Sequence, residues 1–204
     1  GFINLSKVGG DNWRYDIGGR VRTAGFEAND MGFMTEADYT TSWVGVGYNE
    51  HRPSRHLRSW NVNWNLWQSV THGGERWSLG ANVMANFQLK NFWNVSLTGI
   101  YSHGLPSVYA LRGGPRMRLP NRMGFSASVM TDSRKPIQVN LNLNTMFRPA
   151  SDGFSVSLAP SFSWRPSDQL RLSLGASVYR SGGDQWVTRV DQDEAHYIFG
   201  RVSQ

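Results

Sequence analysis

Apolar and polar residues alternate strictly along most of this chain, and this alternation constrains the fold more than any other feature. From Trp77 to Leu89 every odd position is apolar, and the even positions carry mostly small or polar residues. Because successive side chains of a strand point to opposite faces, such a period indicates β-strands. The clearest alternation covers 59–70, 77–89, 92–102, 137–146, 154–163 and 170–178.

Weaker alternation brings the expected number of strands to about twelve, with no convincing helix. These weaker segments are 2–8, 13–23, 38–49, 123–132, 186–190 and 196–202. Pro160 falls within one expected strand and cannot donate to a ladder, so we expect a β-bulge there. The fold class is therefore all-β.

The polar faces of these strands distinguish a membrane sheet from a soluble one. Soluble surfaces are typically about 25–35% charged, whereas the polar faces of 59–70, 92–102, 137–146 and 154–163 carry no charge. Phe154 and Trp164 share one face at a spacing of about ten residues, which spans about 25 Å of membrane in a tilted strand. We therefore predict an antiparallel transmembrane β-barrel over residues 1–204, with a soluble sandwich or soluble barrel as the alternative.

In a barrel, the two sets of alternating residues face lipid and lumen. The expected lipid-facing residues are Trp60, Trp64, Trp77, Leu79, Val83, Phe87, Leu141, Leu143, Leu172 and Leu174. The expected lumen-lining residues are Arg14, Arg20, Arg22, Asn61, Asn63, Asn65, Arg76, Asn140, Asn142, Asn144 and Arg171.

The net charge of the chain limits the classes of partner that we expect. The formal net charge is +6, and most of the 21 basic residues are arginines. Lumenal arginines would favour anions, or they would pair with carboxylates and only fill space; the sequence leaves both open. Nucleic-acid binding is not expected, because no compact basic patch with stacking aromatics occurs. Arginines near the rims are candidates for contact with lipopolysaccharide phosphates, namely Arg112, Arg116, Arg118 and Arg122.

The connections between the expected strands fall into two sets. Short turns at 9–12, 52–55, 90–91, 133–136 and 165–168 alternate with mostly longer connections at 24–37, 71–76, 103–122, 148–153 and 180–185. Outer-membrane barrels have short periplasmic turns and long outer loops. On this count the first strand runs inward and the last runs outward, so we expect an internal stretch of a barrel with at least about fourteen strands.

Several segments together resemble a known family. They are Gly25–Met34 before Asp38-Tyr39, Leu111-Arg112-Gly113-Gly114-Pro115, Ser133-Arg134-Lys135-Pro136 and Tyr197-Ile198-Phe199-Gly200-Arg201. This combination resembles the C-terminal barrel domain of a large family of Gram-negative outer-membrane proteins. In that family a carbohydrate-binding-like β-sandwich usually precedes the barrel. The resemblance implies an outer-membrane location, and it implies no reaction because the family has no established catalytic residues.

Other motifs give weak signals. Arg112-Gly113-Gly114 could form an anion-binding nest, but glycines of a tight loop folding into or over the lumen are the favoured interpretation. Asp191, Asp193 and Glu194 lack the glycine and distal glutamate of a calcium loop. His72 and His103 could act as rim bases, with Asp30 or Glu36 as orienting groups, yet no nucleophile stands at a diagnostic spacing. The remaining histidines are His51, His56 and His196, and the expected topology does not single them out as rim bases.

Together these features predict a non-enzymatic outer-membrane protein without metal or cofactor. We expect a passive channel or a membrane-embedded platform for a surface assembly. The alternatives are an anchor for a carbohydrate-binding domain with a plugged lumen and, less favoured, an outer-membrane hydrolase. Expected partners are outer-membrane lipid and lipopolysaccharide, with other surface proteins or glycans as further candidates.

Overall fold

The computed structural model describes residues 1–23, 38–107, 117–191 and 195–202, and nearly all regular secondary structure in these residues is β-strand. One antiparallel sheet contains eleven strands. They are β1 (Phe2–Lys7), β2 (Trp13–Arg22), β3 (Tyr39–Glu50), β4 (Leu57–Thr71), β5 (Arg76–Leu89), β6 (Asn94–Ser102), β9 (Arg122–Met130), β10 (Ile137–Arg148), β11 (Gly153–Ser167), β12 (Leu170–Gly175) and β13 (Val178–Gly182). The prediction of an all-β chain is confirmed.

Two small hairpins and one helical turn complete the described residues. β7 (Pro106–Ser107) pairs with β8 (Met117–Arg118), and β14 (Asp184–Asp191) pairs with β15 (Ala195–Val202). Pro149–Ser151 form a 3-10 turn. No helix in the described part of the chain is long and apolar enough to cross a membrane.

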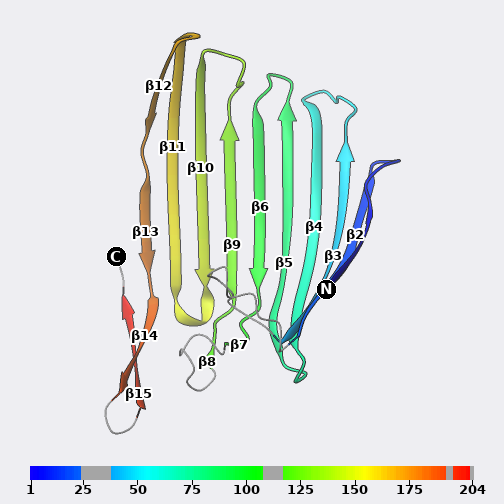
Figure 1. Ribbon diagram of the computed structural model, residues 1–204. Coiled ribbons are helices and arrows are strands. Elements are labelled where there is room, and N and C mark those ends of the chain that lie inside the picture. The colour runs from blue at the N-terminus through cyan, green and yellow to red at the C-terminus, as the bar shows by residue number, and fades with distance from the viewer. Residues whose placement is uncertain (24–37, 108–116, 192–194, 203–204) are drawn as a thin grey trace.

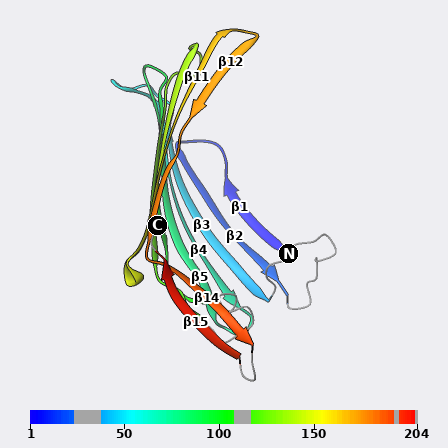
Figure 2. The same ribbon diagram turned by 90° about the vertical axis from the view of Figure 1, so that its left-hand side faces the viewer.

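The large sheet is a meander in one curved layer. Consecutive strands lie side by side in Figure 1, and the view in Figure 2 shows that the layer bends strongly. β1 pairs only with β2, and β12 and β13 pair only with β11, as far as the described strands go. The sheet is therefore open, and the described strands do not form a closed barrel.

The connections separate to opposite ends of the sheet, as the sequence predicts. The short turns lie at the upper end in Figure 1, which we call the short-turn end, and the connection at 149–152 lies at the other end. The expected connection at 180–185 is wrong, because strand structure continues there through β13 and β14. Gly183 has a φ of +65° and bends the chain between them without reversing its direction.

This bend removes one expected reversal of the chain. β15 consequently points the same way as β1, toward the short-turn end (Figure 2). The expectation that the last strand runs opposite to the first is wrong. The strand count of about fourteen for a parent barrel rested on that expectation and loses its basis.

Pro160 interrupts a ladder without causing a bulge. It pairs with Leu141 of β10 in an unbroken register. On the other side of β11, β12 ends at Gly175 opposite Ser161, and β13 begins at Val178 opposite Leu158. The Pro160 carbonyl accepts a hydrogen bond from the Ala176 amide at 3.1 Å, so the missing N–H of Pro160 faces this same side. The proline therefore divides one long strand into β12 and β13, and the expected bulge is absent.

The pairing register separates side chains onto two faces. We call one the apolar face; its central row is Trp13, Tyr48, Val62, Ala85, Leu97, Ala127, Leu143, Leu158 and Val178. We call the other the polar face; its adjacent row is Arg14, Gly47, Asn63, Met84, Thr98, Ser126, Asn144, Ser157 and Tyr179.

Burial on these faces is the reverse of that in a soluble protein. On β4, Trp64 and Leu66 are 43% and 50% exposed, whereas the neighbouring Asn63 and Asn65 are half-buried. Tyr39 is the sole buried hydrophobic side chain among the described residues, and it lies on the polar face. The apolar residues thus form no dry core in this part of the chain.

Candidate functional site: a recess on the polar face

The register brings most of the sequence-predicted site residues together by face. The six predicted asparagines, Asn61, Asn63, Asn65, Asn140, Asn142 and Asn144, all occupy the polar face. Arg14, Arg20 and Arg22 share that face, and Arg171 reaches it through a 2.8 Å bond from its Nε to Ser163 Oγ. The opposite face carries Trp60, Trp64, Leu79, Val83, Phe87, Leu141, Leu143, Leu172 and Leu174.

Arg76 and Trp77 do not follow their predicted sides. The β4–β5 register shifts here, so that Ser69 pairs with Ser78 while Val70 pairs with Arg76. A shift of one residue exchanges the faces of the side chains beyond it. Arg76 therefore occupies an apolar-face position at the rim. Trp77 instead packs edge-on against Tyr39 of the polar face, with ring centroids 5.2 Å apart.

Glycines make a recess on the polar face of β2–β4. A Cβ at Gly47 would lie 2.5 Å from Asn63 Oδ1, and one at Gly45 would lie 2.9 Å from Asn65 Oδ1. The two asparagines of β4 can therefore lie over β3 because β3 has no side chains at these positions. The resulting cavity of about 370 Å³ is bordered by Ser6, Arg14, Asp16, Asn63 and Asn65.

Asp16 forms the negatively charged border of this recess. Its Oδ2 accepts a 2.6 Å hydrogen bond from Ser6, and its Oδ1 accepts a 2.7 Å bond from Trp43 Nε1. Asn4 in turn donates to Ser6 Oγ at 2.7 Å. These bonds hold the carboxylate in place and join β1, β2 and β3 across the polar face.

Asparagine amides form the neutral border. Asn65 donates to Asn82 at 2.7 Å, and Asn61 Oδ1 accepts from both Asn63 and Asn86 at 3.2 and 3.0 Å. An amide side chain offers two donors and two acceptor lone pairs. Each asparagine therefore retains hydrogen-bonding capacity for water or a ligand above the sheet.

The polar-face arginines differ in how far they are free to act on a solute. Arg14 turns toward the short-turn end and donates to the carbonyl oxygens of Asp11 and Trp13. The Arg22 guanidinium lies 5.5 Å from the centre of the Tyr39 ring. Arg20 is exposed. The sequence predicts one basic surface, but some of its arginines interact with other groups of the protein.

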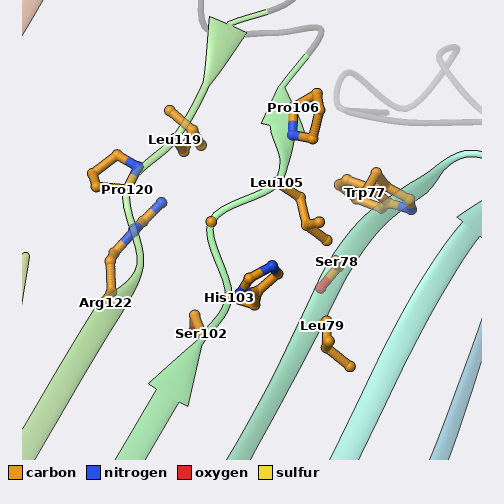
Figure 3. A pocket seen from close by; sticks show the side chains of 11 residues that line it. Trp77, Ser78, Leu79, Ser102, His103, Leu105, Pro106, Leu119, Pro120 and Arg122 are labelled. Atoms are coloured by element: carbon orange, nitrogen blue, oxygen red, sulfur yellow. The ribbon is translucent and has the colours of Figure 1, made fainter. Parts of the chain in front are cut away.

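A second cavity of about 320 Å³ lies at the opposite end of the strands from the short turns, between β5, β6 and β9 (Figure 3). Trp77 and Ser78 of β5 line it together with His103 and Arg122. Gly104 is needed here because a Cβ would lie 2.0 Å from the Leu119 carbonyl oxygen. Among the described residues that line this cavity there is no carboxylate, so none of them is an acidic partner for His103.

His72 has the partners that a rim base would need, although not those expected. Its Nδ1 lies 2.9 Å from Asp38 Oδ1, and its Nε2 lies 3.3 Å from Thr40 Oγ1. All three groups lie where β3 begins and β4 ends. The same contacts join these two strand ends, which accounts for them without a reaction.

Several predicted sites lie outside the described residues. They are Asp30, Glu36, Arg112, Gly113, Gly114, Arg116, Asp193 and Glu194, as well as the side chains of Asp191 and His196. Within the described ranges, no three His, Asp or Glu residues are close enough to hold a metal ion.

Comparison with known families now places the chain. All 204 residues match the family model described as a domain of unknown function, DUF5916. The chain belongs to the DUF5916 family. No curated protein and no solved structure matches the sequence.

Sequence reasoning missed two large residues of the DUF5916 polar face, Trp43 and Trp67. Because tryptophan is classed as apolar, the alternation does not predict either residue on the polar face. The signal was nevertheless present: Trp43 has the same parity as Gly45 and Gly47, and Trp67 the same parity as Asn63 and Asn65.

Proposed function

We propose that this DUF5916 domain forms part of the wall of a transmembrane β-barrel in the outer membrane of a Gram-negative bacterium. The apolar face contacts lipid, and the polar face lines an aqueous lumen through which small solutes pass passively. The observation that carries the proposal is the reversed burial: exposed Trp64, Leu66 and Leu141 on one face, and half-buried asparagines on the other. Exposure of this apolar face to water is unfavourable, whereas its contact with lipid hydrocarbon is favourable.

Strand length supports the proposal. β4 and β11 have 15 residues, β5 has 14, and β3 and β10 have 12. A tilted strand needs about 9–11 residues to cross a bilayer, whereas strands of soluble proteins typically have about 5–6.

Aromatic residues near the short-turn end give a second, independent support. Trp13 packs edge-on against Tyr48 with ring centroids 5.0 Å apart, and Tyr48 lies 5.1 Å from Trp60. These three apolar-face residues form a continuous row across β2, β3 and β4. Rows of aromatic residues mark the lipid–water boundaries of membrane barrels.

Site-directed spin labelling tests the orientation directly, because the chain contains no cysteine. Single cysteines at Val83 and Asn82 provide a matched pair from adjacent positions of β5. In lipid vesicles, we expect oxygen to relax the label at position 83 more strongly and a water-soluble nickel complex to relax the label at 82. Equal access of nickel to both positions would contradict a lipid-facing apolar surface.

Conductance in planar bilayers separates the channel from the platform. A steady ohmic current through the inserted protein supports passive passage of solutes. Stable insertion without current favours a platform or anchor with a blocked lumen, which is the second candidate.

A further inference from the structure

Toward the end of the sheet opposite the short-turn end, the polar face contains two tryptophans in an arrangement that the channel itself does not require. Trp43 of β3 and Trp67 of β4 pair directly across the two strands. On their outer sides they pair with glycines, Gly18 of β2 and Gly80 of β5. Each indole therefore has a neighbouring position without a side chain on its outer side.

Both indoles lie low against the sheet over these glycines. A Cβ at Gly18 would lie 2.2 Å from Cζ2 of Trp43, and one at Gly80 would lie 2.3 Å from Cζ2 of Trp67. The same ring atoms are involved in both cases, so the two side chains adopt equivalent positions. Trp43 is also fixed by its 2.7 Å bond to Asp16. Both residues remain partly exposed, and together they form an aromatic strip from β2 to β5.

Neutral polar groups border this strip along both sides. One register step toward the short-turn end lie Asn65 and Asn82, which bond to each other at 2.7 Å. One step the other way lie Thr41 and Ser69, whose hydroxyl oxygens are 2.8 Å apart. The strip thus combines aromatic surface with amide and hydroxyl groups, and it carries no charge of its own.

Charge near the strip is balanced. Asp16 and Arg20 lie on either side of Gly18 on the polar face of β2. A fixed carboxylate beside Trp43 disfavours an anionic ligand, and Arg20 disfavours a cationic one. The register row then continues from Gly80 to Ser102, which lines the cavity of about 320 Å³ shown in Figure 3. Cavities of this size are at the lower end of those that hold small organic ligands.

We propose that this strip binds neutral saccharides, and that Trp43 and Trp67 are the stacking residues. A pyranose ring has an apolar C–H face that packs on an aromatic ring, and it has edge hydroxyl groups that both donate and accept hydrogen bonds. The amides of Asn65 and Asn82 supply both functions on one side of the strip. The inference rests on the proposed function only in taking the polar face to be reached by solute.

Equilibrium dialysis of the detergent-solubilised protein against labelled maltohexaose tests the strip without requiring a membrane or a current. We expect saturable binding, reduced at least tenfold in affinity by Trp43→Ala and by Trp67→Ala. Trp64→Ala is the matched control, because Trp64 lies on the apolar face of the same strand; its affinity should be unchanged. Trp67→Phe keeps a stacking ring and should retain binding within about threefold, which separates stacking from a folding defect.

Absence of saturable maltohexaose binding, or equal affinity in the wild type and both alanine variants, would overturn the proposal. Displacement of bound maltohexaose by adenosine at lower concentration than by maltose would overturn the assignment to saccharides. A protein that binds maltohexaose but carries no current would contradict the open channel and leave the strip in place.

Discussion

On the polar face, several large side chains pack closely against the sheet because a glycine lies beneath them. Gly80 lies beneath Trp67 and also has the Tyr101 carbonyl oxygen 3.0 Å from its Cβ position. Gly99, on the apolar face of β6, has no atom within 4 Å of that position. Two glycines in neighbouring strands are therefore under opposite constraints.

We expect Gly80→Val to lower the free energy of unfolding by about 1–3 kcal/mol, because the added methyl groups displace the Trp67 indole. Gly99→Val is the control and should be neutral or stabilising, since it adds a branched side chain to open space in a strand. Urea unfolding of protein reconstituted in vesicles measures both. A larger loss at Gly99 than at Gly80 would contradict the packing described.

The turn between β9 and β10 contains an ion pair in which the guanidinium of Arg134 contacts both carboxylate oxygens of Asp132. Arg134 donates from its Nε to Asp132 Oδ1 at 2.8 Å and from its Nη2 to Oδ2 at 2.7 Å. Its guanidinium also lies over the Phe92 ring, 3.2 Å from the ring centre. The hydrogen bonds from Arg134 lower the pKa of Asp132 to about 2.

This lowered pKa predicts a pH dependence of stability. The carboxylate is favoured in the folded state, so its contribution is complete above a pH of about 4 and is lost as pH falls toward 2. Asp132→Asn should therefore lower the urea midpoint at pH 7, whereas at pH 2 the variant and the wild type should have similar midpoints. An equal loss at both pH values would show that Asp132 acts through packing instead of charge.

At the scale of strands, alternation predicts where strands occur and which face each residue occupies. It predicts all of the long strands because each carries polar residues on one face and apolar residues on the other. It cannot predict the register shift at Ser69 and Val70, since a bulge depends on the partner strand, and this shift is why Arg76 and Trp77 occupy unexpected sides. It also cannot separate the bend at Gly183 from a turn, because both interrupt the period in the same way.

Pro160 offers a test at this scale. Pro160→Ala restores an N–H that faces Ala176, so one ladder hydrogen bond can form between β11 and the residues joining β12 to β13. We expect slower amide exchange at 176–178 and a gain of about 0.5–1.5 kcal/mol in the free energy of unfolding. Exchange at Thr145 in β10 should stay unchanged, and faster exchange at 176–178 would contradict the role given to the proline.

The candidate site was predicted in part for the same physical reason. Arg14, Asn63 and Asn65 follow from alternation, because a polar face needs polar residues. The recess they border depends on Gly45 and Gly47, and the aromatic strip depends on Gly18 and Gly80. Which glycine lies beside which large side chain is a property of the strand register, and a single sequence does not reveal it.

At the scale of the whole molecule, the two faces predict opposite responses to charge. Leu141 is 42% exposed on the apolar face, and Asn142 follows it on the polar face. In a membrane, Leu141→Arg should cost about 2–4 kcal/mol because the guanidinium enters hydrocarbon. Asn142→Arg should cost much less, and urea titration of vesicle-reconstituted variants compares the two. Equal costs would contradict the proposed orientation.

The near absence of buried apolar side chains among the described residues also bears on how this chain folds. In water, formation of this sheet removes little apolar surface from solvent, so the hydrophobic effect contributes little to folding. The loss of backbone conformational entropy must still be offset. For a sheet with the proposed orientation, we therefore expect folding and insertion into the membrane to be a single step.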